Sequence, residues 1–526
     1  MNREALYGLA ANPALPAELL DRLIAVADED LACGIAGNAA LTPAQATALV
    51  ERQPGSAVAL VYAGRLGAAD IDPTTRPDVA LALLDQGAGP PEWARLFAAD
   101  PDAEHRERLA ACPDLPSDVR ASLAADPEVR VAAELGWWTT TETATRLAEH
   151  PHADVRRAVA ANDATPPALL AALLTGNGLP PARRCAACDR EPVPFVHDPH
   201  FPRLDCELPS GAACSGAHES TVHEIQHNAL GNRATPTEAV AGFVDHPSML
   251  LRAELAARGD LSPEQTARLA EDPIPLVRLA LAENFHLDEA ACRMLADDGS
   301  HDVRRVLAAN PGLPLDALTR VAGTTRLGPT LLPRIATASP TEIAAAAASA
   351  DAALRMLVAA RRDLPDTIRD TLAGDPDAKV VASIAPHPGL SEARLRAMLA
   401  RHGARVAAGV AANPDASSAL LEELTRQPAP PRKALRAIAR HRNATAPALH
   451  ACLVDDRARR LAAGHPALSP ATLIALLADE DAQVVQAAAA HPMLPVAVMA
   501  EAVSRAEGRG WAVGAGGAPH VGGAAR

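Results

Sequence analysis

Four of the eight cysteines of the chain lie between residues 175 and 220, in a stretch rich in proline and glycine and without helical periodicity. Two thiolates separated by two residues can hold one metal ion from a tight turn, and two further thiolates complete a tetrahedral site. A segment with so few apolar residues cannot fold around a hydrophobic core, so another interaction, such as metal binding, has to stabilise it. We therefore predict a metal site with Cys185, Cys188, Cys206 and Cys214 as its ligands.

The cysteine spacing leaves the identity of the metal open. Zinc (Zn²⁺) is the usual ion of a closed site of four thiolates, but a 4Fe-4S cluster takes the same ligands and would make the protein a redox or iron sensor. The second cysteine pair is separated by seven residues, so His200 or His218 could replace one of its members. The alternative is four unrelated thiols, as we expect for Cys33, Cys112, Cys292 and Cys452, which lie singly among apolar residues and should be small core side chains.

Immediately after this stretch, His223-Glu224-Ile225-Gln226-His227 matches the pattern H-E-x-x-H. On a helix this spacing places both imidazoles on one face, where they could hold zinc with Glu224 as the general base of a hydrolase. The alternative is an ordinary repeat helix in which Ile225 is buried and His223 and His227 face outward. We favour the repeat helix, and either histidine could instead join the neighbouring cysteine site.

The elements that position these residues are repeats. His301–Ala322 reads as two short amphipathic segments joined by Asn310-Pro311-x-Leu313-Pro314. Equivalents of Asn310, which we call register residues, recur mostly in steps of 26 residues, a period typical of a solenoid. The register residues identified in the sequence are Asn12, Asn38, Asn162, Asn232, Arg258, Asn284, Asn310, Arg361, His387, Asn413, His465 and His491, with Cys112 in the same position of a further copy. The pattern is irregular over residues 64–100 and 413–465.

The composition favours a core of small side chains. Five Phe, two Tyr and four Trp are too few for a core built from rings, so Ala, Leu and Val must fill it. Trp137 and Trp138 are adjacent and point to different faces of a helix, so one of the two can be exposed; we favour packing over partner binding. The recurring Val-Arg pairs, such as Val277-Arg278, predict a ladder of arginines. We expect this ladder to pair with Asp and Glu of its own repeats, the alternative being an acidic partner.

The formal net charge of −15 argues against binding to nucleic acid or an anionic membrane. No apolar run is long enough to span a bilayer, and no secretory signal is recognisable at the N-terminus. We expect a cytoplasmic protein whose Ala, Arg, Gly and Pro bias is typical of a GC-rich bacterial genome.

The repeated block NPxLPxxxLxxLA, preceded by DPxxxVRxxxA, resembles the variant leucine-rich repeat family. The resemblance covers all but the cysteine-rich insert and the tail. It implies a right-handed superhelix of alternating α and 3₁₀ helices without strands. It also implies that a Cys-ligated iron–sulfur cluster can accompany such an array, and it transfers no catalytic activity.

We predict an all-α solenoid of about eighteen two-helix repeats. The expected domains are N-terminal repeats (1–174), a Cys/His-rich metal-binding insert (175–220), C-terminal repeats (221–505) and a disordered Gly/Ala-rich tail (506–526). Long repeat arrays present extended surfaces for binding. The predicted function is therefore a non-catalytic scaffold for an unidentified protein or peptide, with no catalytic residues.

Overall fold

The computed structural model describes residues 3–185 and 218–508, and these residues form a helical repeat protein. The predicted all-α class is confirmed: no strand occurs in the described ranges, and their one β-bridge joins His152 to Arg184. The described helices pair into two-helix units, eighteen in all, as the 26-residue period predicts. None of the described helices is both long and apolar enough to cross a bilayer. Of the predicted tail (506–526), residues 506–508 belong to the last described helix, and the rest lies outside the described residues.

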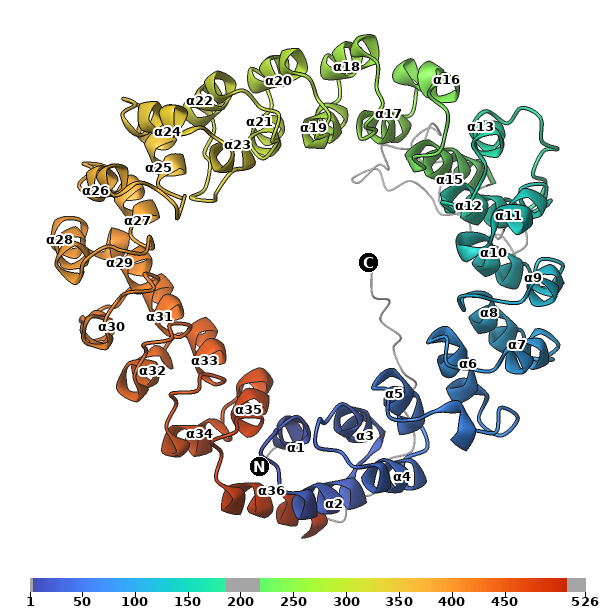
Figure 1. Ribbon diagram of the computed structural model, residues 1–526, viewed down its shortest axis with the longest axis horizontal. Coiled ribbons are helices and arrows are strands. Elements are labelled where there is room, and N and C mark those ends of the chain that lie inside the picture. Colours follow the sequence, from blue (N-terminus) through green and yellow to red (C-terminus); the bar gives the residue numbers. More distant parts are fainter. Residues whose placement is uncertain (1–2, 186–217, 509–526) are drawn as a thin grey trace, which may run out of the picture. The chain divides into compact units, whose positions relative to one another are not determined.

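The described chain divides into two compact units, residues 1–70 with 388–526 and residues 71–387. In the second unit the first helices of successive repeats lie side by side on the concave side (Figure 1). These first helices are α6 (Pro77–Asp85), α8 (Ala103–Ala110), α10 (Val129–Trp138), α12 (Ala153–Ala161), α15 (His218–Gly231), α17 (Met249–Ala256), α19 (Pro275–Glu283), α21 (His301–Leu307), α23 (Pro333–Ala336), α25 (Ala352–Val358) and α27 (Ala378–Ile384).

The second helices of this unit form the convex row (Figure 1). They are α7 (Pro91–Ala98), α9 (Ser117–Leu123), α11 (Thr141–Leu147), α13 (Pro167–Thr175), α16 (Thr237–Val240) continued by the 3₁₀ helix η2 (Ala241–Asp245), α18 (Pro263–Ala270), α20 (Glu289–Ala296), α22 (Leu315–Thr324), α24 (Pro340–Ala347) and α26 (Asp366–Ala373).

The other unit is built in the same way from both ends of the chain. Its first helices are α29 (Ala404–Ala411), α31 (Arg432–Ile438), α33 (Asp456–Ala462), α35 (Ala482–Ala489), α1 (Arg3–Ala10), α3 (Glu29–Ala36) and α5 (Ser56–Tyr62). Its second helices are α28 (Glu392–His402), α30 (Ser418–Thr425), α32 (Ala446–Cys452), α34 (Pro470–Leu476), α36 (Val496–Gly508), α2 (Ala17–Val26), α4 (Pro43–Arg52) and the 3₁₀ helix η1 (Ala68–Asp70).

The α/3₁₀ alternation implied by the family resemblance is not observed. Among the described residues the second helices are α-helical, apart from η1 and the continuation η2. Second helices of seven to ten residues are typical, long enough for about two α-helical turns, and several begin with strong caps. Ser262, for example, forms a capping box with Gln265 and is followed by Pro263 at the first helical position.

The register residues hold successive repeats together through buried polar contacts. The side-chain amide of Asn310 donates to the carbonyl oxygens of Ala282 and Asn284, 28 and 26 residues earlier, at 3.2 and 2.8 Å. Its Oδ1 accepts from the backbone N–H of Gly312 at 2.9 Å. Asn310 is 1% exposed, so these bonds satisfy an amide that would be costly to bury alone. Asn284 repeats the pattern one repeat earlier.

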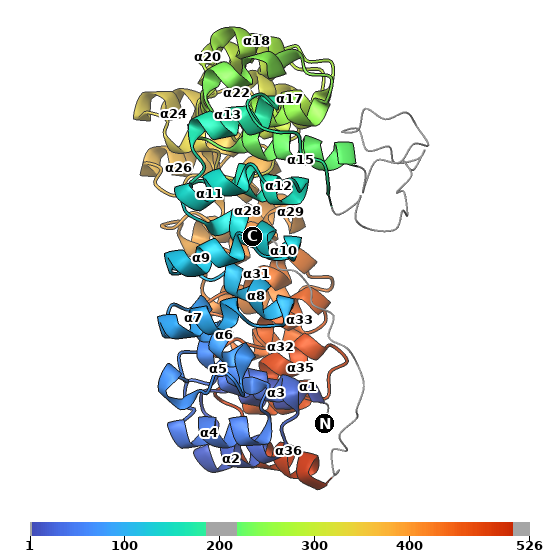
Figure 2. The same cartoon turned by 90° about the vertical axis from the view of Figure 1, so that its right-hand side faces the viewer.

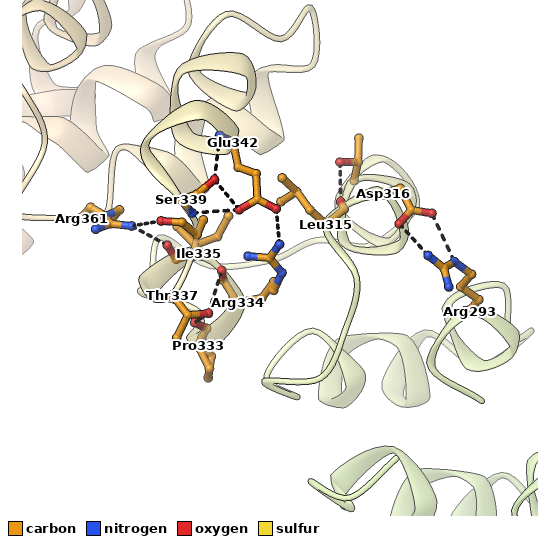
Figure 3. A network of polar contacts seen from close by, with 12 residues as sticks. Arg293, Leu315, Asp316, Pro333, Arg334, Ile335, Thr337, Ser339, Glu342 and Arg361 are labelled. Carbon is orange, nitrogen blue, oxygen red and sulfur yellow. Dashed lines mark hydrogen bonds and ion pairs between the residues drawn. The ribbon is translucent and has the colours of Figure 1, made fainter. Parts of the chain in front are cut away.

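Arginine replaces asparagine at two register positions, and in both repeats an aspartate two residues later forms an ion pair with it. Arg258 donates to the carbonyl oxygens of three residues of the preceding repeat, and pairs with Asp260 at 2.6 Å. Arg361 reaches the carbonyl oxygen of Ile335 at 2.9 Å (Figure 3) and pairs with Asp363. A positive side chain at this position is therefore matched by aspartate two residues later.

Histidine fills the position in the last repeats. His465 and His491 each bond through Nε2 to the carbonyl oxygen of the preceding register residue at 3.1 Å. His441 makes the same contact with Asn413 at 2.7 Å, which identifies it as a register residue that the sequence pattern did not reveal. The irregular segment 413–465 thus consists of one step of 28 and one of 24 residues.

Candidate interaction surface

Of the predicted metal ligands, only Cys185 lies within the described residues; Cys188, Cys206 and Cys214 lie outside them. The Cys185 side chain is fully buried. The backbone just before it is fixed, because the N–H of Arg183 and the carbonyl oxygen of Arg184 bond to Pro151 and Ala153 at the start of α12, at 2.9 and 2.8 Å. The entrance to the cysteine-rich segment is therefore held firmly against the repeats.

At the interruption of the repeats, an arginine of α12 bonds to the backbone of the segment that follows α13. Arg156 on α12 occupies the position of the ladder arginines, and its guanidinium donates to the carbonyl oxygens of His150 and Pro180 at 2.6 Å each. Burial lowers the pKa of Arg156. The array resumes at α15, which has 14 residues and projects at one end beyond its neighbours (Figure 2). Ile225 of α15 is buried, as expected for a repeat helix.

The three functional groups of H-E-x-x-H turn to different neighbours. His223 Nε2 lies 2.8 Å from the hydroxyl oxygen of Ser248, and His227 Nε2 lies 3.2 Å from the Oε2 of Glu254. Glu224 points the other way and forms an ion pair of 2.8 Å with Arg157 on α12. No group of three potential metal ligands occurs in the part of the chain that the structure describes. This geometry links α15 to α12 and α17, as in an ordinary repeat helix.

The adjacent tryptophans have different surroundings. Trp137 is half-buried, and the guanidinium carbon of Arg157 lies 6.0 Å from the centroid of its ring. Trp138 is 70% exposed at the end of α10, so of the two adjacent residues it is the exposed one, and the preference for packing does not hold for it. Its indole N–H donates to the Oε1 of Glu134 at 3.3 Å. An exposed indole of this size is typical of an interface.

The acidic groups beside Trp138 are unequally paired. Glu107 on α8 forms an ion pair of 2.9 Å with Arg130 of α10. Glu134 lies one turn further along α10 and is half-buried; burial raises its pKa, and the nearby Glu107 raises it further, while the Trp138 N–H lowers it. No ion pair of Glu134 with another described residue is present. We call Glu107, Arg130, Glu134 and Trp138 the Trp138 surface.

The predicted arginine ladder pairs within the protein. Arg278 of α19 bonds through Nε to the carboxylate of Asp298 at 2.6 Å, and the Asp298 side chain is only 5% exposed. Arg304 instead donates to the Thr325 hydroxyl at 2.9 Å. Equivalent buried pairs are Arg106–Asp126, Arg252–Asp272 and Arg355–Asp375. These arginines stabilise neighbouring repeats and do not form a free basic face.

A second exposed aromatic residue, Phe285, lies at the rim of a hollow of about 560 Å³. The hollow is lined by the loops that follow α15, α17 and α19, and Gly259 opens it by having no side chain. A Cβ at Gly259 would lie 2.6 Å from the His286 ring. Phe285 directly follows a register residue, where many repeats carry proline, and this departure is a sequence signal that the repeat pattern alone did not single out.

Cys33 differs from the expected core position, because it is exposed. Cys112, Cys292 and Cys452 are buried as predicted, and burial raises the pKa of their thiols to about 12, 11 and 12. These three thiols are therefore protonated at neutral pH and unsuited to metal binding or nucleophilic chemistry.

No family model matches the sequence, and no curated protein matches it. Among solved structures, the chain is similar to a chain of the Pds5–Scc1 complex, a structure described for its implications for cohesin function (13% identity, 94% of this chain and 81% of that chain, TM-score 0.21). It is also similar to an engineered protein (15% identity, 92% and 93% coverage, TM-score 0.12). With TM-scores this low, neither similarity identifies a family or function, and membership of the variant leucine-rich repeat family stays a prediction.

Proposed function

We propose that the protein is a non-catalytic scaffold that binds another protein or peptide along the first-helix row of its repeats. The observation that carries this proposal is the 70% exposure of Trp138, the last residue of α10, a helix of the first-helix row (Figure 1). The chain has only four tryptophans, and tryptophan is enriched at protein interfaces, where a partner buries its large apolar area. The separate partners of His223, Glu224 and His227 support a structural role for α15 rather than hydrolysis.

Photo-crosslinking tests where partners bind. A photoreactive amino acid is placed in the full chain at Trp138 on α10 or Arg305 on α21, both exposed on first helices, and at Glu264 on the second helix α18 as the control. We expect adducts with the same partner, identified by mass spectrometry, from the first-helix positions and none from the control. Equal labelling at all three positions, or no saturable adduct, would overturn the proposal.

We propose that the scaffold also carries a structural metal, zinc by preference, on Cys185, Cys188, Cys206 and Cys214. The buried position of Cys185 and the fixed backbone before it support a structural role for this cysteine. Metal content and the visible spectrum are measured on anaerobically purified wild type and on the Cys185→Ala/Cys188→Ala variant. One colourless zinc that the variant loses is the expected result. A brown protein that contains iron would indicate an iron–sulfur cluster instead of zinc and would favour a redox-sensing role. If the variant retains the metal, the four cysteines are not its ligands.

A further inference from the structure

The two adjacent tryptophans of α10 offer a direct comparison. Trp137 is covered by a guanidinium: Arg157 lies over its ring at 6.0 Å from the centroid and forms an ion pair of 2.8 Å with Glu224. The arrangement has three parts, namely an indole ring, an arginine over it and a carboxylate that binds the arginine. Such a combination of cation–π and charge-assisted contacts is favourable at a partly desolvated site.

Trp138 has two of these three parts. The residue is 70% exposed, and its indole N–H donates to the carboxylate of Glu134 at 3.3 Å. The third part, a guanidinium, is absent among the described residues near this ring: Arg130 is bound to Glu107 at 2.9 Å, and Arg157 is bound to Glu224 and lies over Trp137. The half-buried Glu134 carboxylate is left without a counter-ion among the described residues.

We propose that the Trp138 surface binds an arginine side chain of a basic partner segment, whose guanidinium stacks on the Trp138 ring and donates to the Glu134 carboxylate. The inference rests on the proposed scaffold function and specifies its partner. Arginine is favoured over lysine because its planar group can stack on an indole and donate in its plane to a carboxylate at the same time. The net charge of −15 also favours a basic partner.

The test uses the full chain with 5-fluorotryptophan in place of tryptophan, observed by ¹⁹F NMR. The Trp138 and Trp137 resonances are assigned with the variants Trp138→Phe and Trp137→Phe. The probes are three capped peptides, Gly-Arg-Gly-Arg-Gly and its versions with lysine or glutamate in place of arginine. We expect the arginine peptide to shift the Trp138 resonance saturably, the lysine peptide to bind more weakly, and the glutamate peptide to have no effect.

A matched pair of carboxylate variants tests the second contact. Glu134→Gln should weaken binding of the arginine peptide about fivefold to tenfold, whereas Glu142→Gln, an exposed carboxylate on the second helix α11, should leave it unchanged. Unchanged thermal unfolding of both variants would show that they fold normally. An equal response to all peptides, or equal affinity in both variants, would overturn the inference. If the peptides fail while Arg305 still crosslinks a partner, the arginine site is wrong but the scaffold proposal stands; if both fail, so does the scaffold proposal.

Discussion

Asn12, near the start of the chain, donates from its side-chain amide to the carbonyl oxygen of His491, between the two helices of the last repeat, at 2.9 Å. It also donates to the carbonyl oxygen of Ala489 at 2.8 Å, and its Oδ1 accepts from the Ala14 N–H at 2.8 Å. Asn310 makes the same set of contacts with the repeat before it. The first repeat therefore packs on the last one as if it were its successor, with α1 against α35 and α2 against α36.

Loss of this contact should destabilise the junction of the chain ends. Asn12→Ala leaves two buried carbonyl oxygens and one N–H without their partner, and we expect a loss of about 1–3 kcal/mol in the free energy of unfolding. Urea unfolding followed by circular dichroism measures it. Because Asn38 makes the corresponding contact with the carbonyl oxygen of Ala10 within the N-terminal repeats, Asn38→Ala should cost a similar amount. An unfolding curve of Asn12→Ala identical to that of the wild type would contradict a stabilising contact between the first and last repeats.

A second variant tests the same junction through packing. A Cβ at Gly8 would lie only 2.3 Å from the carbonyl oxygen of Gln486, so Gly8→Ala should separate α1 from α35. Hydrogen exchange should then quicken in both helices, although they are almost the whole chain apart in sequence. Gly67→Ala is the control, since no atom lies within 4 Å of the point that an alanine methyl group would occupy there. Faster exchange in α1 alone would mean that α35 does not depend on the contact.

The buried ion pairs should matter far more than the exposed ones. Removal of Arg278 by Arg278→Ala leaves the Asp298 carboxylate charged and buried, which typically costs about 3–5 kcal/mol. Arg293 forms exposed pairs with Glu289 and Asp316 (Figure 3 shows the latter), and Arg293→Ala should cost far less, because solvent screens these pairs. Equilibrium unfolding of the two variants checks the difference, and similar costs would argue that the Arg278 pair is open to solvent.

Acid should weaken the C-terminal repeats through Asp455. The hydrogen-bonded ion pair with Arg436, at 2.9 Å, lowers the pKa of Asp455 to about 2. Since this pKa lies below that of an unfolded aspartate, near 4, the stabilisation is fully present above about pH 4 and is lost as the pH falls towards 2. Asp455→Asn should abolish this part of the pH dependence, about 1–2 kcal/mol after solvent screening is allowed for. Urea unfolding between pH 7 and 2.5 measures it, and parallel curves for variant and wild type would contradict the assignment.

The register pattern predicted much of the fold but not all of the register. Asn12, Asn310 and their equivalents were recognisable because one residue type recurs at one spacing. His441 was missed because the steps on either side of it are 28 and 24 residues, although their sum keeps the average period. The sequence contains the pattern Arg-x-Asp at Arg258-Asp260 and at Arg361-Asp363. The pattern could be interpreted as an ion pair at a register position only once the structure showed that the arginine side chain is buried.

The candidate surface was harder to predict than the repeats. Adjacent residues on a helix point in different directions, so the sequence indicated that Trp137 and Trp138 would differ, but not which ring would find cover. That depended on Arg157, which belongs to the next first helix and reaches only one of them. The H-E-x-x-H pattern likewise predicted that its three side chains lie on one helix. In the structure each of them contacts a different residue outside this helix, which the pattern could not predict.

The sequence by itself determined the all-α repeat architecture, its period, the buried register positions and the interruption after residue 175, because each follows from local spacing and residue type. Only the tertiary structure decided that Asn12 bonds to the last repeat, that the ladder arginines are buried against aspartates, and that Trp138 is left in solvent. These features depend on which helices become neighbours. A repeated sequence specifies the shape of each unit, but contacts between units distant in the chain are fixed only when the units stack.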